Sequence, residues 1–113
     1  MTHATVHHAL LALLDEERSS LVMVAVAARL LAADATFNLW FSRVAKSDSH
    51  RTEDSILQLV EDYARIERSG VEACAVAASM PRAERERLLV PTLRALTIEL
   101  QDMVGDFDPT ATP

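Results

Sequence analysis

The second half of the chain carries two regular series of apolar positions. Both series alternate spacings of three and four residues. The first consists of Ile56, Leu59, Tyr63, Ile66, Gly70, Ala73, Ala77 and Met80. The second consists of Leu89, Leu93, Leu96, Leu100, Met103 and Phe107. This spacing places the apolar side chains on one face of a helix that packs nearly parallel or antiparallel to a neighbour. The pattern therefore predicts two long helices.

The ends of these two helices can be placed from local signals. The first helix should start just after Asp48 and Ser49, whose side chains can cap it, and Glu53 and Asp54 suit its first turn. Pro81 cannot continue a helix but suits the first turn of the next one, so the first helix should end near Ser79. Gly105 is predicted to cap the second helix, and residues 105–113 then form a frayed tail.

Two residues inside these helices depart from good helix formers. Gly70 costs about 1 kcal/mol relative to alanine in a helix, yet the apolar series continues through it. We interpret Gly70 as a close crossing of helices, and the alternative that it ends a helix at Ser69 stays open. Pro91 removes one backbone hydrogen bond, so it is predicted to kink the last helix.

The first half of the chain is less regular. No residue between Ala4 and Lys46 breaks a helix outright, and a bend or short turn is expected at the polar residues 15–20. Whether residues 4–46 form one helix or two stays open. Residues 21–33 are apolar on almost every side, with Arg29 as the exception. Thirteen residues are short of the roughly 20 that a membrane span needs, so we expect this helix to be covered by protein.

These patterns define the expected fold. The chain of 113 residues has only two glycines and four prolines, which are residues that turns between strands draw on. We predict one all-α domain over residues 1–113, a three- or four-helix antiparallel bundle. The simplest cover for residues 21–33 in so small a chain is a second copy, so we expect homodimerisation to complete the bundle.

The net charge limits the classes of molecule that this protein is expected to bind. The formal net charge is −6, and the charged residues from position 99 onward are all acidic. Such a surface repels nucleic acid and anionic lipid, because binding to both uses clustered lysine and arginine. We expect no nucleic acid and no membrane as partner, and another protein instead. The lone Cys74 and a start without a basic segment before an apolar one favour a cytoplasmic protein.

The sequence predicts no metal, cofactor or catalytic site. His3 and His7 have the spacing of two metal ligands on one helix face, beside His8, but further ligands are missing nearby. Cys74 has no histidine or basic neighbour that would lower its pKa. Glycine-rich phosphate loops and Ser-His-Asp sets are also missing from the sequence.

His50 supplies the alternative from a different functional class. Residues 49–60 pair His50 with Arg51 at the start of an amphipathic helix, and this stretch resembles the phospho-acceptor region of histidine-kinase dimerisation helices. The resemblance implies a histidine phosphotransfer protein. It departs from that pattern at Glu53 and Asp54, whose carboxylates would repel an incoming phosphoryl group. The spacing of Arg43 and His50 is also similar to that of helical ribonuclease domains, without their asparagine after the arginine.

Aromatic residues gather at one place. Phe37, Trp40 and Phe41 are three of the five aromatics, and together with Leu39 they cannot all face one core from one helix. We expect part of this cluster to be exposed, where tryptophan often dominates binding energy. The alternative is that the cluster fills the end of the core. The predicted partner-binding residues are Phe37, Trp40, Phe41, Leu21, Val24 and Leu31.

The function expected from these features is non-catalytic. We predict a small helical regulator that binds and inhibits or sequesters another protein, the general kind to which bacterial anti-activators, anti-sigma inhibitors and export chaperones belong. The sequence does not identify that partner. The histidine phosphotransfer protein that uses His50 is the alternative.

Overall fold

A computed structural model describes residues 5–16, 20–47 and 53–107 of the chain. The regular structure in these ranges consists of four helices: α1 (Val6–Glu16), α2 (Leu21–Ser47), α3 (Glu53–Ala78) and α4 (Arg82–Phe107). The all-α prediction is confirmed, and the number of helices is four. The break between α1 and α2 falls at the polar stretch where a turn was predicted. Residues 4–46 therefore do not form one continuous helix.

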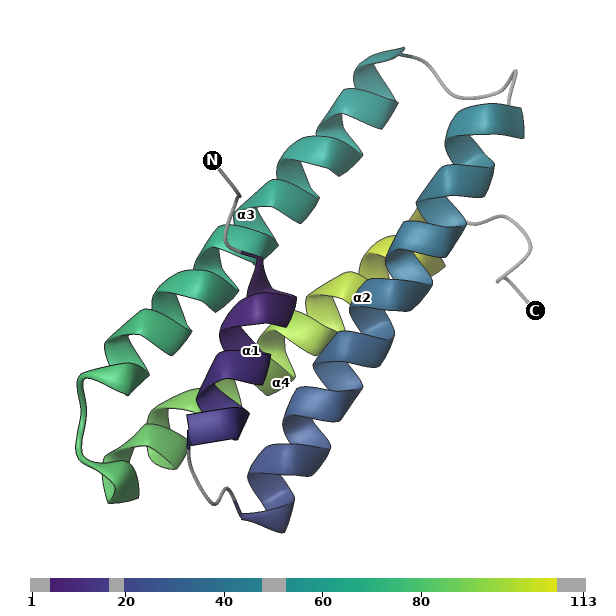
Figure 1. The fold of residues 1–113 in the computed structure, drawn as a ribbon. Helices are drawn as coiled ribbons and strands as arrows, with labels where there is room; N and C mark the ends of the chain where they lie inside the picture. Colours follow the sequence, from purple (N-terminus) through teal and green to yellow (C-terminus); the bar gives the residue numbers. More distant parts are fainter. Residues whose placement is uncertain (1–4, 17–19, 48–52, 108–113) are drawn as a thin grey trace.

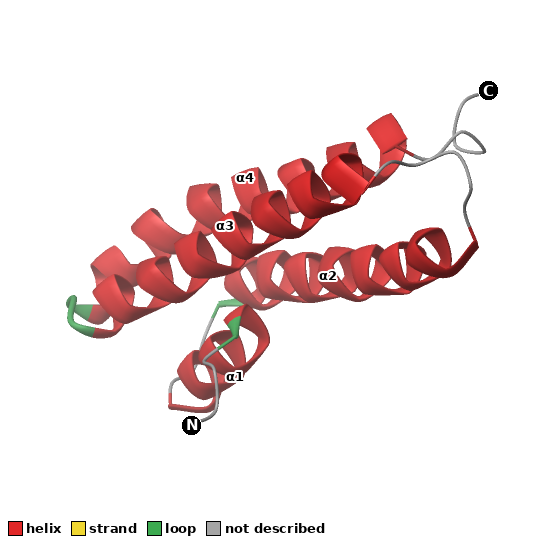
Figure 2. Ribbon diagram, turned by 90° about the horizontal axis from the view of Figure 1, so that it is seen from above, coloured by secondary structure: helices red, strands yellow, loops and turns green. Residues whose placement is uncertain are grey.

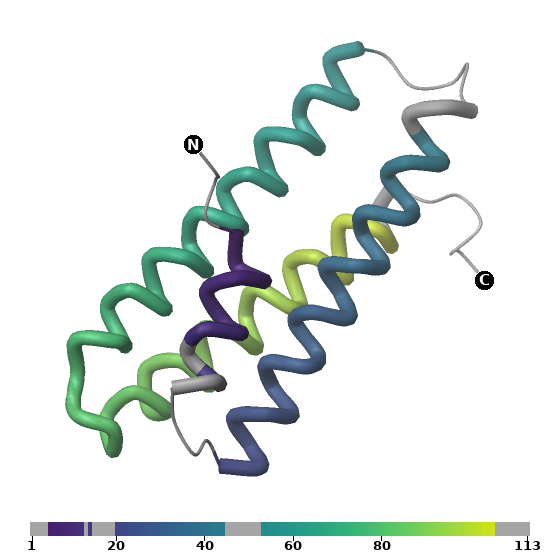
Figure 3. Tube along the Cα trace, in the orientation of Figure 1, coloured from purple at the N-terminus to yellow at the C-terminus, as the bar shows by residue number. Residues whose placement is uncertain are grey.

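Consecutive helices run in opposite directions, as Figure 1 shows. Both α2 and α3 pack along α4, whereas the short α1 packs mainly on α3. Figure 2 shows α1 and α4 on opposite sides of the pair formed by α2 and α3. Since each helix reverses the direction of the one before it, α2 and α4 run in the same general direction. The trace in Figure 3 shows that these two helices cross at an angle.

The core is built from the predicted apolar faces. On α4 the buried positions of the series are Leu89, Leu93, Leu96, Leu100 and Met103. On α3 they are Leu59, Ile66, Gly70 and Ala77, and Cys74 is buried beside them. The inward face of α2 contributes Met23, Val26, Ala27, Leu30, Ala33, Phe37 and Trp40. Both series from the second half of the sequence therefore form the faces that were expected.

Gly70 marks a close crossing of helices, as predicted. The residue is buried inside α3, which continues past it to Ala78. A Cβ atom at Gly70 would lie 2.5 Å from Cγ2 of Val6 in α1 and 3.5 Å from Cδ1 of Leu96 in α4. Only a residue without a side chain lets α1 approach α3 this closely. The alternative that Gly70 ends a helix is excluded.

The first turns of α1 and α2 are capped in the same two-part way. Thr5 Oγ1 accepts the His8 N–H at 3.2 Å, and Ser20 Oγ accepts the Met23 N–H at 3.1 Å. These are the bonds of an N-cap residue to the third residue of its helix. A carboxylate from a distant helix completes each cap. Glu67 of α3 accepts the Val6 N–H, and Glu86 of α4 accepts the Ser20 N–H.

The C-terminal end of the last helix lies further along the chain than predicted. The helix α4 contains Pro91 and continues to Phe107, two residues beyond Gly105. Gly105 does not have a positive φ, the conformation that a capping glycine usually adopts. Gly105 is therefore a helical residue, and the prediction of a cap there is wrong. The remainder of the expected tail, residues 108–113, lies outside the described residues.

Candidate functional site

The aromatic cluster lies in the core. Phe37 stacks on Tyr63 of α3, with ring centroids 4.8 Å apart, and on Phe41 at 5.9 Å. Phe37 and Trp40 are buried, and Phe41 is half-buried against the same core. Leu39 instead points outward and is 57% exposed. The four residues do not all face the core, as expected, but the exposed member is Leu39; the aromatic rings fill the core, as the alternative had it, and are not exposed anchors.

Helix geometry explains this difference. At about 100° per residue, positions 37, 40 and 41 fall within an arc of roughly 100°, so one face of α2 holds all three rings. Leu39 is the member of the group that departs from this arc. The sequence alone therefore indicates that the three aromatic rings share one helix face, once Leu39 is considered separately from them. Of the other predicted partner-binding residues, Leu31 is half-buried, whereas Leu21 and Val24 are exposed.

The side of α2 that faces away from the bundle is apolar. We call it the outer face of α2, and it consists of Leu21, Ala25, Ala28, Ala32, Ala35 and Leu39. All six residues are exposed, and Leu21 reaches 88%. Their spacings are four, three, four, three and four residues, which is the spacing of a helix-packing seam. The structure therefore leaves a complete packing seam of α2 without a partner helix in the described chain.

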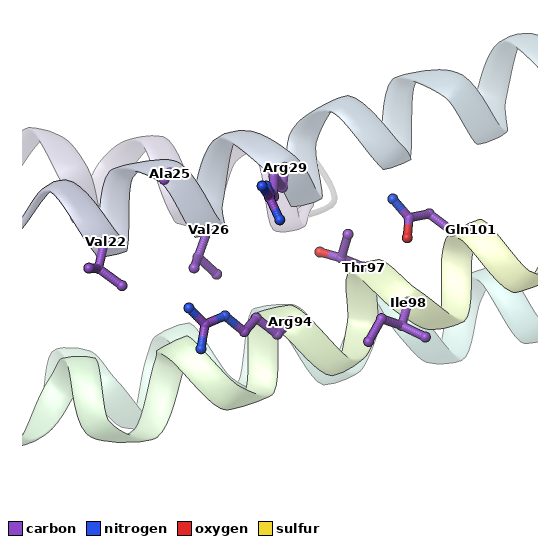
Figure 4. A pocket seen from close by; sticks show the side chains of 8 residues that line it. All are labelled: Val22, Ala25, Val26, Arg29, Arg94, Thr97, Ile98 and Gln101. Atoms are coloured by element: carbon purple, nitrogen blue, oxygen red, sulfur yellow. The ribbon is translucent and has the colours of Figure 1, made fainter.

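A groove follows the line between α2 and α4. Its first hollow, of about 370 Å³, is lined from α2 by Val22, Ala25, Val26 and Arg29 and from α4 by Arg94, Thr97, Ile98 and Gln101. A second hollow of about 380 Å³ continues it and shares Arg29 and Gln101 with the first. We call the two hollows together the α2–α4 groove. Figure 4 shows the side chains of Arg29 and Arg94 projecting into the space between the helices.

The two arginines of the groove have no acidic neighbours one helical turn away. Positions 25, 26, 32 and 33 around Arg29 are alanine or valine, and positions 90, 91, 97 and 98 around Arg94 are also uncharged. Within the described ranges neither guanidinium forms a hydrogen bond or ion pair, whereas Arg65 contacts Glu99 at 3.4 Å. Sequence reasoning missed this pair, because recognising it requires knowing that α2 lies beside α4.

A polar network joins the other side of α2 to α3. The Tyr63 hydroxyl donates to Asp34 Oδ1 at 2.6 Å, and Asn38 Nδ2 donates to the Tyr63 oxygen at 3.1 Å. Glu67 Oε1 lies 2.9 Å from the same oxygen, and Glu67 Oε2 accepts the Val6 N–H at 3.0 Å. The network therefore links α2, α3 and the start of α1.

The network shifts the pKa values of two of its members, Glu67 and Tyr63. Burial raises the pKa of the Glu67 carboxyl, and the charge of Asp34 raises it further. Burial and the hydrogen bond to Asp34 also raise the pKa of Tyr63. The phenol has one hydrogen, which it can donate to Asp34 or to Glu67, the two carboxyl groups beside it. The hydroxyl is then fully used within the bundle, which gives the network a structural role.

The other residues with chemical potential do not assemble into a site. His7 and His8 are exposed on α1. No three His, Cys, Asp or Glu side chains in the described parts of the chain are grouped to hold a metal ion. Burial raises the pKa of Cys74 to about 11, which keeps it a thiol at neutral pH. His3 and His50 lie outside the described residues, so the phosphotransfer and ribonuclease alternatives stay predictions.

One described helix is long and apolar enough to span a membrane by length and composition alone. It covers Leu21–Val44, so the apolar character extends beyond the thirteen residues noted in the sequence. A third of its most apolar window is buried within the bundle. The core helix of a soluble protein passes the same test, so this observation is weak evidence for a membrane span.

The chain was compared with protein-family models, with curated proteins and with solved structures. None of these three comparisons finds a match. The basis for a functional proposal is therefore the geometry of the two surfaces on α2, namely its outer face and the α2–α4 groove.

Proposed function

We propose that this protein is a non-catalytic helical interaction module, which forms a homodimer through the outer face of α2 and binds and inhibits or sequesters another protein. The observation that carries the proposal is the exposed seam of six apolar residues on α2. Burying a leucine side chain contributes about 1.5–3 kcal/mol, and each copy has Leu21 and Leu39 at the ends of the seam. The four alanines between them permit close approach of two helices.

The seam is self-complementary. Its residues read Leu-Ala-Ala-Ala-Ala-Leu in either direction. In an antiparallel pair of α2 helices, Leu21 of one copy therefore lies opposite Leu39 of the other, and alanine lies opposite alanine. This is the symmetry that a twofold homodimer requires, since the same patch must fit itself. A second copy is thus a better fit to this face than an arbitrary helix.

The shape of the isolated chain also supports a dimer. Its extents are 50 × 37 × 17 Å, and its radius of gyration is 15.4 Å. A compact domain of this length has a radius of gyration of roughly 13 Å. The single chain is flatter than such a domain, and it leaves large apolar side chains such as Leu21 and Leu39 exposed, which association of two copies would cover.

The non-catalytic part of the proposal rests on how the half-buried polar side chains between the helices are used. Asp34, Tyr63 and Glu67 are the titratable side chains that converge in the described bundle, and they bond to one another and to the backbone of α1. Their arrangement stabilises the packing of helices. The outer face of α2 is instead apolar, and the α2–α4 groove combines apolar residues with two arginines, which suits recognition of another protein surface.

Sedimentation velocity over a range of micromolar concentrations tests the dimer. We expect a mass of about twice 12.4 kDa for the wild-type chain. Ala28→Glu places a charge at the centre of the outer face and should give a monomer with unchanged helicity by circular dichroism. The matched control is Ala75→Glu at an exposed position of α3, which should stay dimeric.

Two results would contradict the dimer proposal. One is a wild-type chain that sediments as a monomer at 100 µM. At that concentration, any dimer whose association free energy is more favourable than about −5.5 kcal/mol would be detected. The other is wild-type chain that floats with neutral lipid vesicles, because the outer face of α2 would then face lipid. Capture of a protein from native extract by the wild-type chain, compared with chain unfolded by heat, tests partner binding separately.

A further inference from the structure

The geometry points to an acidic amphipathic helix of a partner protein as the occupant of the α2–α4 groove, held by carboxylates that pair with Arg29 and Arg94. This inference rests on the proposed function, since it names the chemistry of the protein partner. The groove shares Ala25 and Ala32 with the outer face of α2, but the residues that would hold the ligand, Arg29, Arg94 and Ile98, are not part of that face.

The length of the groove fits a helix. Its two hollows extend along α2 from Val22 to Thr36, and fourteen residues of helix rise roughly 21 Å. That distance accommodates about four turns of a docked helix. Val22 and Ile98, which are 52% and 56% exposed, form apolar rims on the two sides. Helices that bind such grooves present apolar residues at positions i, i+3 or i+4, and i+7.

The charges select an acidic occupant. The chain has a net charge of −6, yet the charged side chains that line both hollows are arginines alone. Within the described part of the chain Arg29 and Arg94 have no carboxylate partner, although Arg65 on α3 has one in Glu99. A guanidinium binds a carboxylate through two parallel hydrogen bonds, and a partly apolar site strengthens this contact. Glutamate or aspartate beside the apolar stripe of a ligand helix meets both requirements.

The arrangement of polar groups agrees with this occupant. Arg29 and Gln101 lie at the junction of the two hollows, and Arg94 lies in the first one. A ligand helix therefore meets one cation near its middle and one toward an end, with apolar surface between and beyond them. A small carboxylate would contact a single hollow and leave most of the groove exposed. Nucleic acid is a poor occupant, because phosphate binding uses many clustered lysines and arginines, and the cations that line this groove are Arg29 and Arg94 alone.

Fluorescence anisotropy with two designed peptides tests this inference. The probe is a labelled 15-residue helix with leucine along one face and glutamate on both sides of that face. The matched peptide has lysine in place of every glutamate. The full chain should bind the acidic peptide at least tenfold more tightly than the basic one, and added salt should weaken the binding. Amide chemical-shift changes should be confined to α2 and α4.

Substitutions in the groove provide the specific readout. Arg29→Gln and Arg94→Gln should each weaken binding of the acidic peptide by about tenfold, the size expected for loss of one charge-assisted contact. The matched control Arg87→Gln removes an exposed charge elsewhere on α4 and should leave binding unchanged. Equal binding of both peptides, or no effect of Arg29→Gln and Arg94→Gln, would overturn the inference.

The monomeric variant separates this inference from the dimer proposal. Ala28→Glu leaves the lining residues of the groove intact, so it should still bind the acidic peptide in an arginine-dependent way. If wild-type chain is monomeric but shows arginine-dependent binding, the groove inference stands and the dimer proposal fails. If the dimer forms and neither peptide binds, the groove inference fails and the dimer proposal stands.

Discussion

Replacement of Gly70 by alanine should destabilise the protein, although alanine is the better helix former. A Cβ at this position would lie 2.5 Å from Cγ2 and 3.1 Å from Cβ of Val6. Those atoms belong to a stiff β-branched side chain on another helix, so relief requires movement of α1. Overpacking of this kind costs about 1–3 kcal/mol, whereas glycine-to-alanine replacement inside a helix contributes about 1 kcal/mol. We expect a net loss of about 1 kcal/mol.

Gly105 is the matched control on the same chain. It is also helical, and a Cβ there would meet no atom within 4 Å. Gly105→Ala should therefore stabilise the protein by up to about 0.5 kcal/mol, a reduced helix-propensity gain because the position lies near the end of α4. The two glycine substitutions are predicted to have opposite signs. Urea unfolding followed by circular dichroism measures both, at one fixed protein concentration because a dimer's stability depends on concentration.

A double-mutant cycle tests the cause of the loss at Gly70. Val6→Ala removes the methyl group that lies closest to the added Cβ. The loss in the double variant should be smaller than the sum of the two single losses by about 1 kcal/mol, which is a favourable coupling of residues in contact. If Gly70→Ala stabilises the chain as Gly105→Ala does, α1 does not cross α3 at this residue.

Three further predictions concern the core and its titratable groups. Trp40→Ala should lower the free energy of unfolding by about 3–5 kcal/mol, because Trp40 is buried; an unchanged urea midpoint would contradict the core assignment. Glu67 has a raised pKa in the folded chain. Its contribution to the free energy of unfolding is therefore fully present below the pKa of the unfolded chain and is lost as the pH rises through the pKa of the folded chain. Glu67→Gln removes the titratable group but keeps an acceptor for the Val6 N–H, and should flatten this decline in urea titrations at successive pH values. The buried thiol of Cys74, with its pKa near 11, should react with a thiol reagent at neutral pH only as fast as the chain opens, and urea should accelerate the reaction; rapid reaction of native chain would show that Cys74 is accessible.

Local patterns in the sequence were sufficient for much of the fold. The two apolar series placed the buried faces of α3 and α4, because a helix places residues three and four apart on one side whatever it packs against. Pro81 separated the two helices for a reason that is equally local. The crossing at Gly70 followed from an apolar series that continued through a glycine.

Features that depend on which helices become neighbours were not predictable in this way. The cap that Glu86 provides for Ser20 joins residues 66 positions apart, and its two hydrogen bonds lower the pKa of Glu86. In the sequence, Glu86 lies in the charged run 82–87, a pattern that favours a solvent-exposed helix face. The convergence of Arg29 and Arg94 likewise depends on the placement of α2 beside α4. The sequence contains each partner of these contacts but not the pairing.

The interleaved packing of the helices has a consequence for synthesis of the chain. The apolar helix α2 ends at Ser47, and its main packing partner α4 is complete only at Phe107, sixty residues later. At about 5–20 residues per second, a ribosome needs roughly 3–12 s to produce that segment. Throughout this interval the side of α2 that packs on α4 and the outer face of α2 are both without cover. We therefore expect nascent chains stalled before α4 to aggregate or to bind chaperones. In chains that include α4, α2 should instead pack at once on the hairpin of α3 and α4.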